Sequence, residues 1–249
     1  MRDSKTGRHR AILLAVAAIG VAATAAAATR TVTISEAFDG GLVNLVPGDE
    51  LVVRLSGNVG TGYVWTLAFH SADVLKPEGG SSAEQAPIPG APGVKVFRFR
   101  AANRGPASVG FAYGRPSEKD AAPARLFRAL VMVGATVAPR HHSVRDTDDS
   151  SRLFLTQGDT LFVRLPATPS TGYGWTITRN APSVLKPAGE PKWEGPTVPG
   201  AEGIQVLEFQ VAGAGADWLE LTYRRPFEPD SKAVKTWNLF VATAGLATK

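Results

Sequence analysis

The sequence predicts an all-β protein that consists of two tandem antiparallel β-sandwich domains. Three observations support this fold class. The chain repeats itself after 110 residues, its apolar residues alternate along short segments, and Gly and Pro punctuate those segments. No segment after residue 28 shows a convincing helical period. Many short strands separated by Gly- and Pro-containing turns are typical of a β-sandwich.

The repeat defines the domain organisation. Residues 48–116 align with residues 158–226 without a gap, and 28 of these 69 positions are identical. A unit of about 110 residues is long enough to bury a hydrophobic core of its own. The join falls around residues 137–142, where the last strand-like segment of the first repeat ends. We therefore expect domain 1 over residues 29–139 and domain 2 over residues 140–249.

Residues 1–28 have the layout of a secretory signal peptide. A basic stretch precedes the apolar run 11–23, and small residues at 25–28 offer cleavage sites. An uncleaved membrane anchor is the alternative reading. Without this segment the chain has 23 Lys and Arg against 21 Asp and Glu, a charge of +2 that does not favour nucleic acid. We expect a periplasmic or secreted protein with no stable membrane insertion after cleavage.

The composition sets one further limit. The chain contains no Cys, so an exported protein with this sequence has no disulfides and depends on packing alone.

The expected strands follow the same order in both repeats. Segments 51–55 and 161–165 place Leu and Val on one face and Arg on the other, and each follows a Gly-Asp turn. A descending strand at 65–69, a short rising one near 74–75, and strands 94–100 and 107–113 complete the first repeat. The alternation breaks at Val96-Phe97 and at Val206-Leu207, which predicts a bulge at those positions.

Strand direction places three loops at one end of each sandwich. The first loop follows 51–55, the second precedes 94–100, and the third follows 107–113. If each strand reverses the direction of the one before it, all three loops lie at the same end. Loops that cluster on a rigid sandwich commonly form binding surfaces.

The first loop carries the most specific pattern. Thr61-Gly62-Tyr63 and Thr171-Gly172-Tyr173 recur, although their neighbours differ. An ordinary hairpin, in which Gly supplies a positive φ and Tyr packs sideways, is the alternative. Trp65 and Trp175 are expected in the core, because a Trp that opens a sandwich strand is usually buried. A similar structural role is expected for Tyr113 and Tyr223.

The other two loops carry weaker patterns. Residues 89–93 match residues 199–203 in a Gly-x-x-Gly spacing, which alone indicates a turn. Arg115-Pro116 matches Arg225-Pro226, and an isolated Arg-Pro is usually a solvated Arg before a stiff loop. Three recurring patterns in the same order, at one end of each domain, indicate a binding surface.

Enzyme chemistry finds little support in the sequence. The only His residues after residue 28 are His70, His141 and His142; the position that matches His70 is Asn180, and the adjacent pair lies in the expected linker. There is no Cys nucleophile, no His-rich metal spacing and no G-x-S-x-G elbow. The recurring acids are expected to be solvated loop residues: Glu118, Asp120, Glu228 and Asp230. We predict a protein that is not an enzyme and needs no metal or cofactor.

The three loop patterns resemble those of chagasin-like inhibitors of papain-type cysteine peptidases. That family carries N-P-[ST]-T-G-[YF]-x-W, then a Gly-rich loop, then R-P-W. The matching segments here are residues 58–65, 90–93 and 115–116 in domain 1, and 168–175, 200–203 and 225–227 in domain 2. The resemblance implies an immunoglobulin-like sandwich whose three loops enter the active-site cleft of a papain-like cysteine peptidase. It thereby implies reversible, competitive inhibition.

The resemblance also assigns residues to peptidase binding. In domain 1 they are Asn58, Thr61, Gly62, Tyr63, Gly90, Gly93, Arg115 and Pro116. In domain 2 they are Thr168, Pro169, Ser170, Thr171, Gly172, Tyr173, Gly200, Gly203, Arg225, Pro226 and Phe227.

The two domains depart from the family pattern to different extents. Domain 1 has Val59-Gly60 in place of Pro and Ser or Thr, and Ser117 in place of the final Trp. Domain 2 keeps Pro169 and has the aromatic Phe227, which predicts that domain 2 binds more tightly. The alternative function is a non-inhibitory β-sandwich module for binding or adhesion at the cell envelope.

Overall fold

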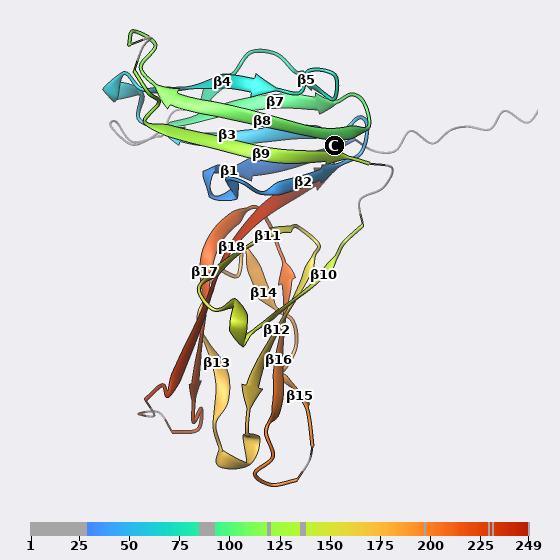
Figure 1. Ribbon diagram of the computed structural model, residues 1–249, viewed down its shortest axis with the longest axis vertical. Helices are drawn as coiled ribbons and strands as arrows, with labels where there is room; N and C mark the ends of the chain where they lie inside the picture. Colours follow the sequence, from blue (N-terminus) through green and yellow to red (C-terminus); the bar gives the residue numbers. More distant parts are fainter. Residues whose placement is uncertain are drawn as a thin grey trace, which may run out of the picture.

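The computed structural model describes residues 29–84, 93–118, 121–134, 138–196, 198–228, 230 and 232–248 (Figure 1). The predicted signal peptide, residues 1–28, lies outside the described residues. The described chain consists of β-strands with short 3-10 turns and forms two sandwiches in tandem. The predicted fold class, two tandem immunoglobulin-like β-sandwiches, is confirmed.

Domain 1 contains two facing sheets. One contains β1 (Arg30–Ser35), β3 (Glu50–Gly57), β7 (Gly93–Ala101), β5 (Leu75–Pro77) and β6 (Ser82–Glu84), the last two both paired with β7. The other has the order β2 (Leu42–Leu45), β9 (Arg125–Val133), β8 (Gly105–Gly114) and β4 (Val64–His70).

Domain 2 repeats this arrangement. Its first sheet contains β10 (His141–Arg145), β12 (Thr160–Ala167), β16 (Gly203–Val211), β14 (Leu185–Pro187) and β15 (Lys192–Glu194). Its second contains β11 (Ser151–Thr156), β18 (Lys235–Thr248), β17 (Gly215–Arg224) and β13 (Gly174–Arg179). Short 3-10 turns are η1 (Glu36–Phe38), η2 (Val59–Thr61), η3 (Asp146–Asp148) and η4 (Pro169–Thr171).

The assignment of His141 and His142 to a linker is wrong. Both residues open β10, which pairs in parallel with β12. The Nε2 atom of His142 lies 3.1 Å from Oδ2 of Asp159, so this side chain joins the start of domain 2 to the turn before β12.

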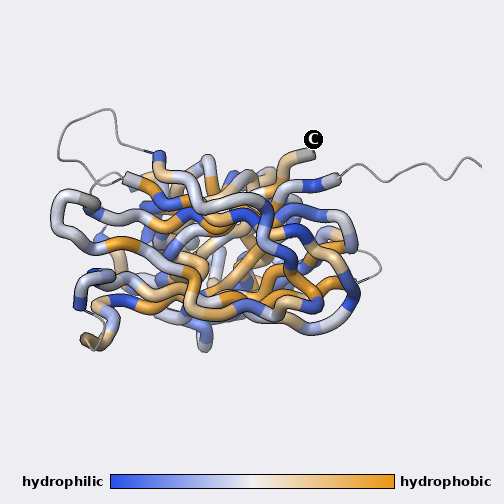
Figure 2. Tube along the Cα trace, turned by 90° about the horizontal axis from the view of Figure 1, so that it is seen from above, coloured by the Kyte–Doolittle hydropathy of each residue, from blue (hydrophilic) through white to orange (hydrophobic). Residues whose placement is uncertain are grey.

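The alternation along the strands produces the two cores. Leu51, Val53 and Leu55 of β3 are buried, and the equivalent residues of β12 are buried in the same way. Trp65 and Trp175 are also buried, as predicted, and their indole N–H groups each donate to a strand carbonyl 2.9 Å away. Apolar stretches lie mainly within the strands and polar ones at many of the turns (Figure 2). Burial of alternate residues therefore accounts for the packing of both sandwiches.

The predicted bulges at Val96-Phe97 and at Val206-Leu207 are both wrong, because neither strand pair shifts register there. β3 and β7 stay in register through Val96 and Phe97. The register shifts lie instead where β4 pairs with β8 and where β13 pairs with β17. Phe97 faces the core, whereas Val96 lies on the outer face of the sheet. An ion pair of 2.6 Å between Arg54 of β3 and Glu84 of β6 crosses β7 on that outer face. These two side chains cover Val96 on the outer face. Val96 is therefore buried although the strand contains no extra residue.

β18 joins the two domains. Its first part pairs with β17 and β11 of domain 2, and its last residues pair antiparallel with β1 of domain 1. Ala242 and Ala244 of β18 belong to the core of domain 1, and the rings of Phe38 and Phe154 meet edge to face at 5.2 Å between centroids. One continuous sheet therefore runs through both domains. None of the described residues forms a helix long and apolar enough to cross a membrane.

Candidate functional site

The described parts of the three loops lie at one end of each sandwich. In each domain the first loop follows the strand that ends at Gly57 or Ala167, and the third follows the strand that ends at Gly114 or Arg224. We call this surface the loop end of the domain. Figure 1 shows the loop end of domain 1 at the left of the view and that of domain 2 at the bottom.

The tip of the first loop has the same geometry in both domains. The backbone N–H and the hydroxyl of Thr61 both donate to the carbonyl of Asn58, at 3.2 and 2.6 Å. Thr171 makes the same two bonds to the carbonyl of Thr168, at 3.0 and 2.6 Å. The next residue, Gly62 or Gly172, has φ of 77° in each domain. This left-handed conformation is unfavourable for residues with a Cβ, so the tip requires Gly.

The two domains stabilise the start of this loop by different means. In domain 1 the side-chain oxygen of Asn58 accepts a bond of 3.1 Å from the N–H of Gly60. In domain 2 Pro169 occupies the first position of η4 and fixes its own φ. The N–H groups of Asn58 and Thr168 both donate to a Tyr hydroxyl at 3.0 Å. The side chain of Asn58 therefore stabilises the start of the loop in domain 1, and the ring of Pro169 does so in domain 2.

An Arg from the third loop holds the Tyr of the first loop. The guanidinium of Arg115 lies 4.7 Å from the ring centroid of Tyr63, and Arg225 lies 4.8 Å from that of Tyr173. The Tyr rings stack in turn on Tyr113 and Tyr223, with centroids 5.4 and 5.6 Å apart. Such cation–π and ring contacts fix the first loop against the third.

The expectation that Glu118 and Glu228 are simply solvated is incomplete. Both side chains are exposed, but Glu118 accepts a bond of 2.8 Å from Arg115, and Glu228 accepts one of 3.1 Å from Arg225. This hydrogen bond to Glu118 raises the pKa of Arg115. The Arg-x-x-Glu spacing recurs in both repeats, and this recurrence was the signal that could have identified the pair.

Domain 2 shows the contacts between all three loops. The hydroxyl of Ser170 accepts a bond of 2.8 Å from the N–H of Gly200 in the second loop. Phe227 of the third loop packs its ring against Gly172, where an added Cβ would lie 2.9 Å from Cζ of Phe227. The Phe227 side chain is nevertheless 67% exposed. The structure therefore brings Ser170, Gly172, Gly200 and Phe227 together on one surface.

The remaining predicted residues fall into three groups. Gly90 lies outside the described residues, so its position is not given by the structure. Gly93 and Gly203 open β7 and β16, directly after the second loop. Pro116 and Pro226 are exposed in the turn that follows β8 and β17.

Several residues that support the loop end were missed. Arg125 stacks on Tyr113 at 4.3 Å and on Trp65 at 5.1 Å, and it donates to a carbonyl of β3. In domain 2 the amide side chain of Gln205 bonds to both the N–H and the carbonyl of Trp175, at 2.8 and 2.9 Å. A basic residue recurs at the position that matches Arg125, where Lys235 lies 5.9 Å from the ring of Tyr223, and this recurrence could have identified Arg125. Gln205 matches Lys95, so the repeat gave no signal for it.

The chemistry of the loop end suits binding and not catalysis. The tip presents the Thr hydroxyl and a Gly backbone without charge, above a base of packed aromatic rings. No group of three or more metal-ligating side chains occurs among the residues that the structure describes. A rigid, uncharged tip can enter a narrow cleft without placing an unpaired ion in it.

Comparison with known proteins identifies one matching family. The family described as Chagasin family peptidase inhibitor I42 matches residues 44–131 and again residues 155–241. A search of curated protein sequences found no match.

Solved structures show weaker likenesses. The cysteine protease inhibitor EhICP2 from Entamoeba histolytica is 21% identical, with a TM-score of 0.39, over 42% of this chain and 96% of that one. PbICP-C, solved in complex with falcipain-2, is 20% identical, with a TM-score of 0.28, over 43% of this chain and 92% of that one. At TM-scores this low, these likenesses support no conclusion on function.

Proposed function

Because the chain belongs to the chagasin family of peptidase inhibitors, we propose that it inhibits papain-like cysteine peptidases reversibly and competitively. Each family match spans the three loops of one sandwich, so the chain is a peptidase inhibitor with two family domains and is not an enzyme. The proposal adds the class of target, the mode of inhibition and the surface that binds.

One observation carries the proposal: the same braced loop tip occurs twice. In each domain a Thr closes the turn, a Gly with φ of 77° forms the tip, and an Arg stacks on the following Tyr. The bonds that hold the turn agree within 0.2 Å between the domains, although only 28 of 69 aligned positions are identical. Pre-organisation of this kind reduces the ordering entropy that is lost on binding.

The geometry explains how binding would block the target. Gly62 and Gly172 lack a side chain, so the backbone of the tip can approach the floor of a cleft closely. The neighbouring Thr hydroxyl can exchange its local bond for polar groups of the cleft. Phe227 offers domain 2 an exposed ring beside the tip, and aromatic rings of this kind are frequent anchors in interfaces. Occupation of the cleft by these groups excludes substrate, and the absence of a covalent step makes the inhibition reversible.

We further propose that the inhibitor is exported and acts in the periplasm or outside the cell. The support is the basic, apolar and small-residue layout of residues 1–28. N-terminal sequencing of the exported protein should give a start near Thr29 in the soluble fraction. A start at Met1 in the membrane fraction would contradict export by cleavage.

The experiment that tests the inhibitory function is a titration of papain with purified residues 29–249. We expect a rise in the apparent KM for a peptide substrate, no change in kcat, and full recovery of activity on dilution. A chain that folds but leaves papain active at micromolar concentration would favour the alternative, a non-inhibitory binding module of the cell envelope.

A further inference from the structure

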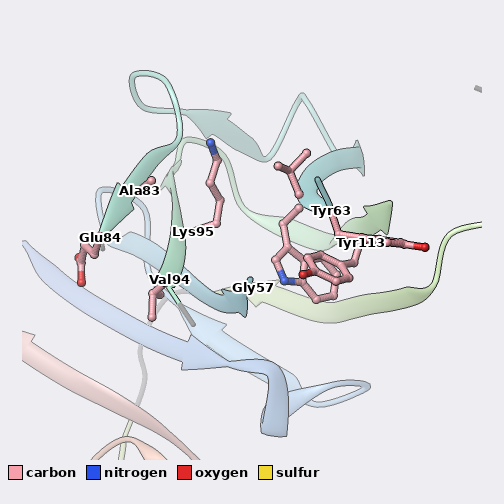
Figure 3. Close-up of a pocket in the computed structure, with 10 residues that line it drawn as sticks. Gly57, Tyr63, Ala83, Glu84, Val94, Lys95 and Tyr113 are labelled. Atoms are coloured by element: carbon pink, nitrogen blue, oxygen red, sulfur yellow. The ribbon is translucent and has the colours of Figure 1, made fainter. Parts of the chain in front are cut away.

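A pocket beside the loop end distinguishes domain 1 from domain 2. It is a cavity of about 80 Å³ that is open to solvent on one side. Figure 3 shows Ala83, Val94 and Lys95 on one wall and the rings of Tyr63 and Tyr113 on the other. Most of the lining is apolar, and Lys95 and Glu84 are the charged residues at its wall, with the Glu84 carboxylate bound to Arg54 on the outer face of the sheet.

The pocket adjoins the surface that we propose for peptidase binding. Gly57 lies directly before the first loop, Tyr63 lies in that loop, and Gly93 lies directly after the second loop. The Arg54–Glu84 ion pair holds the outer strand of the pocket against β7. A partner seated on the first and second loops would therefore meet the pocket.

Domain 2 fills the corresponding place with its own side chains. By the offset of 110 residues, Ala83 corresponds to Trp193 and Lys95 to Gln205. The Trp193 ring covers Gly203, where an added Cβ would lie 2.3 Å from Cζ2 of Trp193. Gln205 is held by its two bonds to the backbone of Trp175. The same position thus carries a hollow in domain 1 and a packed indole in domain 2.

We infer that the domain 1 pocket takes one large apolar side chain from the rim of the bound peptidase's cleft. It thereby gives domain 1 a different selectivity from domain 2. This inference rests on the proposed function, because the occupant belongs to the peptidase. An apolar, half-enclosed pocket beside an interface is a favourable site for an apolar anchor, whereas the packed Trp193 leaves no room for one. Two domains with different selectivity allow one chain to inhibit a wider set of peptidases.

The test fills the pocket by substitution. Ala83→Trp is made in a full chain whose domain 2 tip is disabled by Gly172→Glu. Inhibition constants are measured for papain, bromelain and cathepsin L. We expect Ala83→Trp to weaken inhibition of the peptidase that domain 1 inhibits best by tenfold or more. The matched control is Ser82→Trp, because Ser82 lies on the same strand but pairs with the outward-facing Val96. This control should change each constant by less than twofold.

Two further variants keep the inference falsifiable if Ala83→Trp does not fold. Ala83→Leu fills the pocket partly and should weaken inhibition of the same peptidase by a smaller factor. Trp193→Ala, in a chain whose domain 1 tip carries Gly62→Glu, opens the pocket in domain 2 and should change the order in which domain 2 inhibits the three peptidases. Folded variants whose constants stay within twofold of their parents, with only the melting temperature changed, would show that the pocket merely packs the inhibitor's own chain. Absence of inhibition by the parent chain would overturn the proposed function and the pocket together.

A second inference rests on a different observation, the continuous strand β18. The antiparallel pairing of Arg30–Thr33 with Gly245–Thr248 joins the domains through main-chain bonds. A bond of 2.8 Å from the N–H of Leu246 to Gln157 fixes this strand a second time. Figure 1 shows that β3 and β8 of domain 1 lead toward one side of the molecule, whereas β12 and β17 of domain 2 lead toward its lower end. The two loop ends therefore face different directions in one joined structure.

We infer that one chain binds two peptidase molecules at the same time. Calorimetric titration of residues 29–249 with papain should give two molecules per chain, and Gly62→Glu or Gly172→Glu alone should each give one. A parent chain that binds one papain although each single variant also binds one would show that the loop ends compete. A single variant that binds none would show that only one domain is active. The proposed function itself fails separately, if the parent chain gives neither binding heat nor inhibition.

Discussion

Phe227→Ser tests whether the third loop of domain 2 contributes to the interface. Serine is the residue that domain 1 has at this position, Ser117. Phe227 is 67% exposed and its ring rests on Gly172, so the change removes apolar surface from the loop end without opening the core. Folding should survive, since substitutions at exposed positions usually change stability by less than about 0.5 kcal/mol.

The expected loss of affinity follows from the exposed area of the ring. A Phe side chain buries about 200 Å², so a side chain that is two-thirds exposed can lose about 130 Å² more on binding. At about 25 cal/mol per Å², complete cover contributes about 3 kcal/mol, and half cover contributes about half of that. Because the ring already rests on Gly172, little ordering entropy offsets this gain. We expect a loss of about 2 kcal/mol, or about thirtyfold in the inhibition constant.

The assay must read domain 2 alone while the chain stays whole. Papain inhibition is therefore measured for Phe227→Ser in the Gly62→Glu background, against that background itself. The control is Leu130→Ser, a half-exposed apolar residue on the outer face of β9 in domain 1. A folded Phe227→Ser chain that inhibits within twofold of its parent would refute the reasoning, because the ring would then remain in solvent in the complex.

Three other predictions concern stability and the ranking of the domains. Ending the chain at Ala244 removes the pairing with β1, so calorimetry should show two thermal transitions where the full chain shows one; a single unchanged transition would mean that this pairing does not couple the domains. The Arg54 hydrogen bond lowers the pKa of Glu84, so this carboxylate stabilises the fold above the unfolded pKa of about 4.3, and the contribution is lost as pH falls through the lower folded value. Glu84→Gln should therefore lower the melting temperature slightly at neutral pH and not at pH 2, and equal losses at both would exclude a charge effect. Finally, the Gly62→Glu chain, which relies on domain 2, should inhibit papain about tenfold or more better than the Gly172→Glu chain, and an equal or reversed order would show that Pro169 and Phe227 were overrated.

The fold could be predicted largely from local pattern. Alternation along 51–55 and 161–165 identified buried strands, and the repeat showed that any feature of one domain should recur in the other. The alternating direction of the strands was enough to predict that the loops lie at one end of each domain, as their described parts do. The bulge was misplaced because burial of Val96 depends on cover by Arg54 and Glu84, which are distant in sequence and meet only through strand pairing.

The residues of the candidate site were predicted from the sequence, but the contacts that hold those residues in place were not. Recurring motifs identified Tyr63 and Arg115, yet their stacking needs the third loop to fold back over the first. Gln205 matches Lys95, so comparison of the domains could not reveal it, whereas the basic pair Arg125 and Lys235 recurs but lies outside the loop motifs. The pairing of β18 with β1 also escaped prediction, because a strand that extends from one domain into another has no mark of its own in the sequence.

The central claim is that the two Gly tips enter the cleft of a papain-like peptidase. Its most direct test compares papain inhibition by residues 29–249 with that by the double variant Gly62→Glu and Gly172→Glu. Each tip has φ of 77° and no side chain, so a Glu both strains the turn and brings a charge into the cleft, at a cost of more than about 2 kcal/mol per site. We predict competitive inhibition by the parent chain and its loss, by thirtyfold or more, in a double variant with an unchanged circular dichroism spectrum. A folded double variant that inhibits papain as well as its parent would contradict the account.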